Sequence, residues 1–118
     1  MMRVLITDDN LVWKSLVDIW LCETDIIYTI VDGPFEAVAA LQTLMFDIVV
    51  VDLYMPNMSG GKLCDYIEKN YPNIKVIMVS VMDISELNKY KCKYKYVKPH
   101  EKNDFIEILE TVYKNNLL

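Results

Sequence analysis

The sequence predicts an α/β fold of three layers, with a five-stranded parallel sheet between two layers of helices. Five short apolar segments alternate along the chain with five longer segments whose apolar residues recur at helical spacing. The short segments are rich in β-branched residues and are mostly apolar throughout, which is typical of parallel strands covered on both faces. Because crossovers between parallel strands are right-handed, few topologies remain.

Length and composition indicate the class of protein. The chain has 118 residues, 53% of them hydrophobic, and we assign residues 1–118 to one domain with its own core. No apolar run reaches the roughly 18–20 residues that span a bilayer, and the N-terminus lacks the pattern of a signal peptide. The net charge of −5 argues against direct nucleic-acid binding. Three widely spaced cysteines indicate reduced thiols in a cytoplasmic protein, rather than a disulfide framework or a zinc site: Cys22, Cys64 and Cys92.

The first half of the chain begins with three strands separated by two helices. Asn10 is a suitable N-cap for the first helix, and Pro34 suits the first turn of the second. Asp32 is expected to cap that second helix. In order, we predict a strand at 3–7, a helix at 10–22, a strand at 26–31, a helix at 32–45 and a strand at 47–52. The apolar stripes of the two helices are predicted to be Val12, Leu16, Ile19 and Trp20, and Ala37, Val38, Leu41, Leu44 and Met45.

The second half continues the alternation. Its first helix should end before Pro72, because the residue before a proline disfavours helical backbone. The segment before the last strand is polar and short, so only a short helix is expected there. We predict a helix at 61–71, a strand at 75–80, a helix at 84–90, a strand at 94–98 and a helix at 103–115. The stripe of the last helix is predicted to be Phe105, Ile108, Leu109 and Val112.

Four of the five predicted strands end in, or are followed directly by, polar residues that suggest a site: Asp8 and Asp9, Asp52, Ser80 and Lys98. Asp32, after the second strand, is expected only to cap a helix. A single aspartate after a strand is usually a turn or capping residue. The group is different, because the carboxyl ends of parallel strands meet at one edge of the sheet. Three close carboxylates repel one another unless a cation lies among them, and Mg²⁺ prefers such oxygen ligands. A metal, an ammonium and a nucleophilic carboxylate together suit phosphoryl transfer.

These residues resemble those of a known family. The segments VLITDDN, VVVDLYMPNMSGG, VIMVS and YVKP, each at a strand end and in this order, are similar to the receiver domain of two-component response regulators, the CheY-like family. The resemblance covers essentially the whole chain. It implies the flavodoxin-like (βα)5 fold with strand order 2-1-3-4-5. It also implies a regulatory phosphoacceptor rather than an enzyme, acting with a sensor histidine kinase or a phosphotransfer protein.

The resemblance implies a role for each matching residue. Asp52 would accept the phosphoryl group. Asp9 and Asp52 would bind Mg²⁺ (or Mn²⁺), assisted by Asp8, and the backbone carbonyl of Tyr54 would be a further ligand. Lys98 would pair with Asp52 or with the phosphoryl oxygens.

Two further features concern the switch. Ser80 would bond a phosphoryl oxygen and so transmit the signal. The peptide bond between Lys98 and Pro99 would be cis, an uncommon form even before proline.

The sequence departs from the family pattern near its C-terminus. The stretch from Ser80 to Lys98 is about one helical turn shorter than usual, so the fourth helix should be short. The position of the family's switch aromatic is Lys95, and Tyr94 or Tyr96 would have to replace it. The alternation KYKCKYKY predicts an edge strand protected by lysines, or else a basic docking surface. Pairing with a second copy or an effector would use residues 84–96 and the last helix.

Two alternatives to a phosphorylation switch remain open. A pseudo-receiver would use the same fold as a constitutive interaction module, and the departures at Lys95 and in the fourth helix favour it. A haloacid-dehalogenase-like phosphatase is disfavoured, because its two aspartates are separated by one residue and Asp8 and Asp9 are adjacent. Bulky Tyr54 and Met82 beside the site suggest slow hydrolysis of a phosphoryl group.

Overall fold

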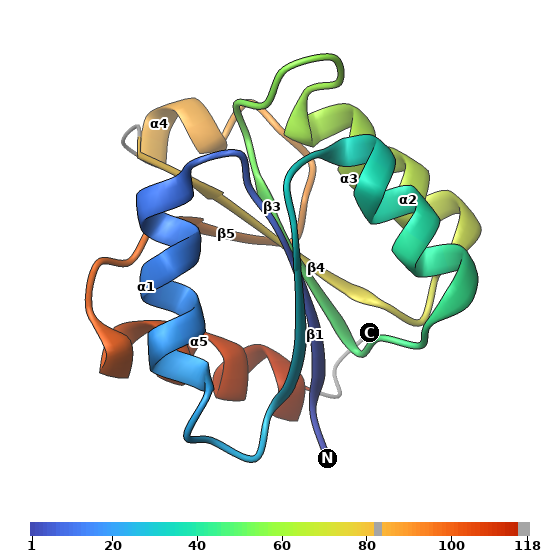
Figure 1. Ribbon diagram of the computed structural model, residues 1–118. Helices are drawn as coiled ribbons and strands as arrows, with labels where there is room; N and C mark the ends of the chain where they lie inside the picture. Colours follow the sequence, from blue (N-terminus) through green and yellow to red (C-terminus); the bar gives the residue numbers. More distant parts are fainter. Residues whose placement is uncertain (82–83, 116–118) are drawn as a thin grey trace.

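The computed structural model of the chain describes residues 1–81 and 84–115, and every predicted helix and strand is present in it (Figure 1). The strands are β1 Arg3–Thr7, β2 Ile27–Val31, β3 Ile48–Asp52, β4 Lys75–Ser80 and β5 Tyr94–Val97. The helices are α1 Leu11–Leu21, α2 Pro34–Thr43, α3 Gly60–Asn70, α4 Ile84–Leu87 and α5 Lys102–Lys114.

The sheet has the predicted topology. Its five strands lie in the order β2-β1-β3-β4-β5, and every neighbouring pair is parallel. Helices α1 and α5 cover one face, and α2 and α3 cover the other (Figure 1). The flavodoxin-like three-layer architecture is therefore confirmed. Among the described residues, no helix has both the length and the hydropathy to cross a bilayer.

Strand β3 is the centre of this arrangement. All five of its residues are buried, and it pairs with β1 on one side and β4 on the other. Its side chains alternate between two apolar clusters: Ile48 and Val50 pack under α1 and α5, whereas Val49 and Val51 pack under α2 and α3. Burial on both faces explains the continuous apolar run and fixes the position of the residue that ends the strand, Asp52.

The prediction of helix caps was right at one end and wrong at another. The Asn10 side chain accepts a hydrogen bond from the backbone N–H of Trp13 at 2.9 Å, as an N-cap does. Asp32 does not cap α2, whose N-cap is Gly33. The Asp32 carboxylate instead pairs with Lys14 of α1. Because Asp32 lies one residue too early, its side chain faces the neighbouring helix.

The buried stripe of α1 differs from the prediction. Leu16 and Trp20 contribute to the core as expected, but Val12 and Ile19 are 70% and 65% exposed. Trp13, Val17 and Leu21 are buried instead. The apolar residues of α1 form two overlapping stripes, either of which could face the core. Packing against the α5 core selects the one that contains both indole rings. The ends of the α2 stripe are also wrong, since Leu44 and Met45 lie beyond the helix and are exposed.

The segment between β4 and α5 has the predicted short helix and an edge strand. Helix α4 has four residues and ends at Leu87, not at residue 90. Strand β5 lies at the edge of the sheet and begins only at Tyr94, so the expected strand alternation does not extend back to Tyr90. Within β5, Tyr94 and Tyr96 pack against the core under α1 and α5. The ammonium of Lys95 donates a hydrogen bond to the backbone carbonyl of Tyr90 at 2.9 Å.

Candidate functional site

The predicted site residues lie together at the carboxyl edge of the sheet. Asp8 follows β1, Asp52 and Ser80 end β3 and β4, and Lys98 follows β5. These four residues are at most 8% exposed, whereas Asp9 is exposed. One carboxylate oxygen from each of Asp8, Asp9 and Asp52 can be chosen so that all three lie within 4.8 Å of one another. The convergence expected from the parallel topology is therefore present.

Lys98 supplies the positive charge of this cluster. Its Nζ lies 2.6 Å from Oδ2 of Asp8 and 3.8 Å from Oδ2 of Asp52. The other oxygen of Asp8, Oδ1, accepts the backbone N–H of Asn10 at 2.8 Å. The pairing of Lys98 with Asp52 was implied by the family resemblance, but the shorter contact with Asp8 was not. Asp8 is consequently held on both oxygens by the protein itself, and of the three carboxylates only that of Asp9 is exposed.

No pattern in the sequence indicates that Trp13 belongs to this site. Its ring centroid lies 4.7 Å from Nζ of Lys98, close enough for a cation–π contact. Its indole N–H donates to the carbonyl of Pro99 at 2.8 Å, and its ring meets Phe105 edge-on at 5.6 Å between centroids. Trp13 therefore orients Lys98 from the side of α1. Spacing along the helix can predict that such a residue is buried, but not that it touches a lysine 85 positions later.

The expected cis bond between Lys98 and Pro99 is wrong. No described peptide bond is cis. The trans form is favoured by about 0.5–1 kcal/mol before proline, and in this form the Pro99 carbonyl accepts the indole N–H of Trp13. The backbone N–H of Lys98 also donates to the carbonyl of Ser80 at 2.7 Å, which joins β5 to the end of β4.

The carboxyl group of Asp52 has a pKa raised to about 6. Burial is the largest cause, and the neighbouring Asp8 carboxylate adds to it; Lys98 and a backbone hydrogen bond from Tyr54 oppose them. Burial and the repulsion between carboxylates therefore raise the pKa of Asp52 by more than the Lys98 ammonium lowers it. A cation bound between Asp9 and Asp52 would relieve this repulsion, so the oxygen donors fit a hard divalent ion.

A family comparison identifies the class of protein. A model of the response regulator receiver domain matches residues 4–110. The chain belongs to this family. Chemotaxis protein CheY of Listeria monocytogenes is 29% identical over 119 residues, which covers 97% of this chain and all of that protein. A protein-glutamate methylesterase/protein-glutamine glutaminase of Caulobacter vibrioides is 35% identical over 83 residues, 69% of this chain. That match spans only 24% of the methylesterase.

Solved receiver domains have the same fold. The receiver domain of the Francisella response regulator 1452 superposes with a TM-score of 0.82 at 25% identity, over 97% of this chain and 98% of that one. Response regulator TrrA of Thermotoga maritima, solved with Mg²⁺ and BeF, gives a TM-score of 0.83 at 23% identity, over 95% and 99%. The family resemblance drawn from the four motifs is confirmed.

The pKa of Asp52 makes the stability of this receiver domain depend on pH. Since the pKa of about 6 in the folded state is higher than the ordinary aspartate value of 3.8, the folded state takes up a proton before the unfolded state does. Stability should rise as pH falls from 7 through 6 toward 4. Asp52→Asn removes the charge, and in metal-free buffer it should increase the free energy of unfolding at pH 7 by up to about 3 kcal/mol.

Urea unfolding of wild type and Asp52→Asn, at pH 7 and at pH 4.5, measures this effect. The increase in the free energy of unfolding caused by Asp52→Asn should be present at pH 7 and mostly absent at pH 4.5, because at pH 4.5 Asp52 is protonated in the folded wild type. An equal difference between the two proteins at both pH values would contradict the raised pKa.

Gly60 lets the loop after Asp52 close onto the strand. A Cβ atom at this position would lie 2.3 Å from the carbonyl oxygen of Asp52 and 2.7 Å from Cα of Leu53. The backbone N–H of Gly60 donates to the carbonyl of Leu53 at 2.9 Å. The start of α3 is therefore packed directly against the backbone that carries Asp52, and no side chain fits between them.

Gly60→Ala should destabilise the receiver domain by about 1–3 kcal/mol, because the added methyl group meets backbone that cannot move freely. The matched control is Gly61→Ala. A Cβ at Gly61 would lie 2.8 Å from the ring of Tyr90, a side chain that can rotate. This control should change stability by less than about 1 kcal/mol, since the helix favours alanine. Equal losses in the two variants, measured by thermal unfolding, would contradict the proposed close packing.

The remaining residues singled out from the sequence lie outside the cluster of Asp8, Asp9, Asp52 and Lys98. Tyr54 follows Asp52 by two residues and is 50% exposed, while Met82 lies outside the described residues. Tyr94 and Tyr96, the candidates for the switch aromatic, are half-buried and pack against the core under α1 and α5. Lys95 occupies the position between them and contacts the backbone of Tyr90. The aromatic ring beside α3 is that of Tyr90, which packs with the core under α2 and α3.

Proposed function

We propose that this receiver domain is a phosphoacceptor of a two-component system, in which Asp52 receives a phosphoryl group from a histidine kinase or a phosphotransfer protein. The observation that carries the proposal is a cluster of three carboxylates at a single sheet edge, two of which lie within 4 Å of one buried ammonium. One oxygen of Asp52 would attack phosphorus as the bond from phosphorus to the donor breaks, and the donor would leave with the bonding electrons.

The donor set supports Mg²⁺, or Mn²⁺, as the metal of this reaction. Asp9 and Asp52 would hold it, with the backbone carbonyl of Tyr54. Asp8 would assist from its fixed position beside Lys98. When bound, the ion would neutralise the carboxylates and the phosphoryl oxygens.

Two side chains would sense the phosphorylated state. Lys98 lies 3.8 Å from Oδ2 of Asp52, so its ammonium could turn from Asp8 toward the phosphoryl oxygens. Ser80 is fully buried at the end of β4 and would bond another of these oxygens. Phosphorylation adds about 1.5–2 negative charges at pH 7, and the response of Ser80 and Lys98 would shift the β4–β5 edge. The domain would thus act as a regulatory switch in the cytoplasm rather than as an enzyme with its own substrate.

The phosphodonor and the output partner would bind two different surfaces of the domain. The phosphodonor would meet the sheet edge at Asp52, beside the exposed Asp9. Residues 84–96 and α5 would meet an effector or a second copy. Because Lys95 replaces the usual aromatic and α4 has only four residues, a pseudo-receiver that signals without phosphorylation is the second candidate. Tyr94 or Tyr96 would serve as the switch aromatic only if the ring left the core under α1 and α5.

Acetyl phosphate with Mg²⁺ tests the proposal directly. The intact mass of the protein should increase by one phosphoryl group, and hydroxylamine, which cleaves acyl phosphates, should remove it. No increase would favour the pseudo-receiver. Release of phosphate from added phosphoesters with repeated turnover would instead indicate an enzyme.

The exposed ring of Tyr54 should slow hydrolysis of the phosphoryl group by limiting the approach of water. Tyr54→Asn should shorten the lifetime of the phosphorylated protein about three- to tenfold, a change of roughly 0.7–1.4 kcal/mol in the barrier. Release of phosphate after removal of the donor measures it. Phe35→Asn, which changes an exposed aromatic residue on α2, is the control and should leave the lifetime unaltered. An unchanged lifetime in Tyr54→Asn would contradict this role.

A further inference from the structure

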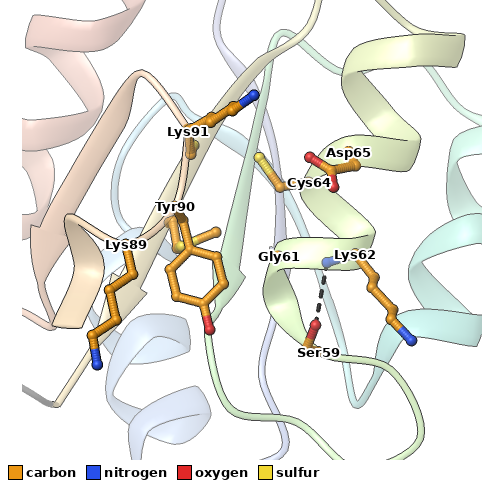
Figure 2. Close-up of a pocket in the computed structure, with 10 residues that line it drawn as sticks. Ser59, Gly61, Lys62, Cys64, Asp65, Lys89, Tyr90 and Lys91 are labelled. Carbon is orange, nitrogen blue, oxygen red and sulfur yellow. Dashed lines mark hydrogen bonds between the residues drawn. The ribbon is translucent and has the colours of Figure 1, made fainter.

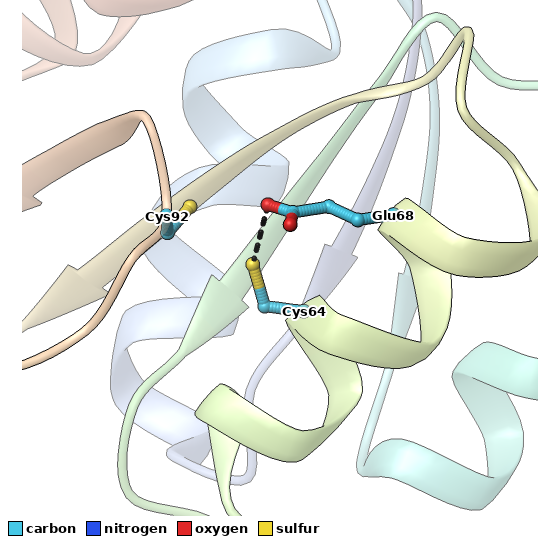
Figure 3. Close-up of side chains that lie close together, drawn as sticks. All are labelled: Cys64, Glu68 and Cys92. Carbon is cyan, nitrogen blue, oxygen red and sulfur yellow. Dashed lines mark hydrogen bonds between the residues drawn. The ribbon is translucent and has the colours of Figure 1, made fainter.

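A second cluster of side chains lies between α3 and the segment before β5 (Figure 3). Cys64 and Glu68 are one helical turn apart on α3, and Cys92 comes from the other chain segment. The two sulfur atoms and a carboxylate oxygen of Glu68 all lie within 4.8 Å of one another. The sequence predicts unrelated thiols, because 28 positions separate the two cysteines. The fold brings them together by placing β4 and β5 side by side.

The distances within the cluster suit one metal ion. Sγ of Cys64 lies 3.3 Å from Oε1 of Glu68. In a tetrahedral zinc site, with Zn–S about 2.3 Å and Zn–O about 2.0 Å, a sulfur and an oxygen ligand are about 3.5 Å apart and two sulfurs about 3.8 Å apart. Small rotations about the side-chain bonds would bring the three atoms to this geometry. Two sulfurs select a softer cation than the carboxylates around Asp52 do.

The surroundings of Cys92 favour a thiolate. The Cys64 thiol, and backbone hydrogen bonds at Tyr94 and Met78, lower the pKa of Cys92 against the effect of burial. Cys92 in turn raises the pKa of Cys64, as do burial and the Glu68 carboxylate. Because a thiol must lose its proton to bind a metal ion, binding should release protons from the pair.

The cluster borders a cavity and includes one exposed side chain. Cys64 and Cys92 line a cavity of about 440 Å³ between α3 and residues 89–92, whose rim carries Lys62, Lys89 and Lys91 (Figure 2). Glu68 is exposed. An ion could therefore enter without unfolding of the sheet, although both sulfur atoms belong to residues that are at most 4% exposed.

We propose that Cys64, Cys92 and Glu68 form a binding site for a thiophilic divalent cation, Zn²⁺, with water in the fourth position. The site is separate from the phosphoacceptor and does not depend on it. The bound ion would join α3 to the segment before β5, across the cavity beside the short helix α4. It would thereby restrict motion of the segment between α4 and β5, where the sequence departs most from the family pattern.

Titration with Zn²⁺ tests the proposal, with reduced full-length protein and Mg²⁺ in large excess to occupy the oxygen site. Calorimetry should give one Zn²⁺ per chain, and Co²⁺ should give a thiolate-to-metal charge-transfer absorption band. Cys64→Ser and Cys92→Ser should each weaken binding by about 100-fold or more, beyond the 10–100-fold effect of losing a residue behind the ligands. Glu68→Gln, on the surface, should weaken it about tenfold or more.

Cys22→Ser is the matched control, because Cys22 is an exposed thiol on the same chain; it and Asp52→Asn should bind Zn²⁺ like wild type. Alkylation of the wild-type protein adds a readout that needs no core substitution: Zn²⁺ should protect Cys64 and Cys92, but not Cys22, from iodoacetamide. Three results would overturn the proposal: no binding by reduced wild type, unweakened binding by Cys64→Ser/Cys92→Ser, or a Cys64–Cys92 disulfide that persists in the reduced sample and excludes the ion.

Discussion

Asp52→Asn should abolish the incorporation of phosphate from acetyl phosphate and Mg²⁺. An amide nitrogen or oxygen is a poor nucleophile toward phosphorus, whereas a carboxylate can form an acyl phosphate. The substitution keeps the shape of the side chain at the end of the buried strand β3, so loss of the fold would not explain the result. It should also weaken Mg²⁺ binding, because a ligand charge is removed. Intact-mass analysis over a time course measures the incorporation.

The control for this variant is Asp32→Asn. Asp32 also follows a strand, but it lies after β2 and pairs with Lys14 outside the acidic cluster. This variant should be phosphorylated at the wild-type rate. A phosphoryl group that remained on Asp52→Asn, traced by peptide mapping to Asp8 or Asp9, would show that another carboxylate is the acceptor. Loss of labelling in both variants would indicate that the charge of the whole edge, and not one nucleophile, is required.

Lys98→Met should destabilise the metal-free protein by about 3–5 kcal/mol at pH 7, because removing one partner of a buried ion pair leaves a buried charge without compensation. Lys98 is 5% exposed and Asp8 is fully buried, and their charged atoms are 2.6 Å apart. Loss of the cation–π contact with Trp13 adds to the effect. Chemical unfolding in the presence of a chelator measures the free energy.

Two comparisons isolate the cause of this loss. Asp8→Asn/Lys98→Met should recover a substantial part of the stability, because the uncompensated carboxylate is then absent. Lys114→Met removes an exposed pair with Glu110 at 3.7 Å and should cost about 0.5 kcal/mol or less. A double variant as unstable as Lys98→Met would mean that the lysine stabilises the protein through packing of its alkyl chain and not through its charge.

The sequence predicted the fold well because local and global signals agree. The five strands, the Asn10 cap and the place of Pro34 in the first turn of α2 each follow from local pattern. The stripe of α1 did not, because apolar residues lie on more than one face and only packing against Phe105 selects Trp13 over Val12. The short α4 was predictable from the missing turn before the last strand.

The sequence predicts which residues form the site better than it predicts which of them contact one another. Parallel topology alone brings Asp8, Asp52 and Lys98 to one edge, whatever the loops do. Which carboxylate the ammonium contacts depends on side-chain positions about one ångström apart and on the indole of Trp13, and no motif encodes this. The nearness of Cys64 and Cys92 was likewise invisible, since it depends on how α3 meets the segment before β5.

The position of Lys98 has a consequence for the synthesis of the protein. The hydrogen bond from Trp13 to Pro99 spans 86 positions, and β5 is the last strand to leave the ribosome as well as the edge of the sheet. A nascent chain that has released β1 to β4 already holds Asp8 and Asp52, but their counter-charge is still inside the exit tunnel. The acidic edge therefore gains its lysine only after β5 has been synthesised, and a fragment that ends before β5 is left with carboxylates that no ammonium holds.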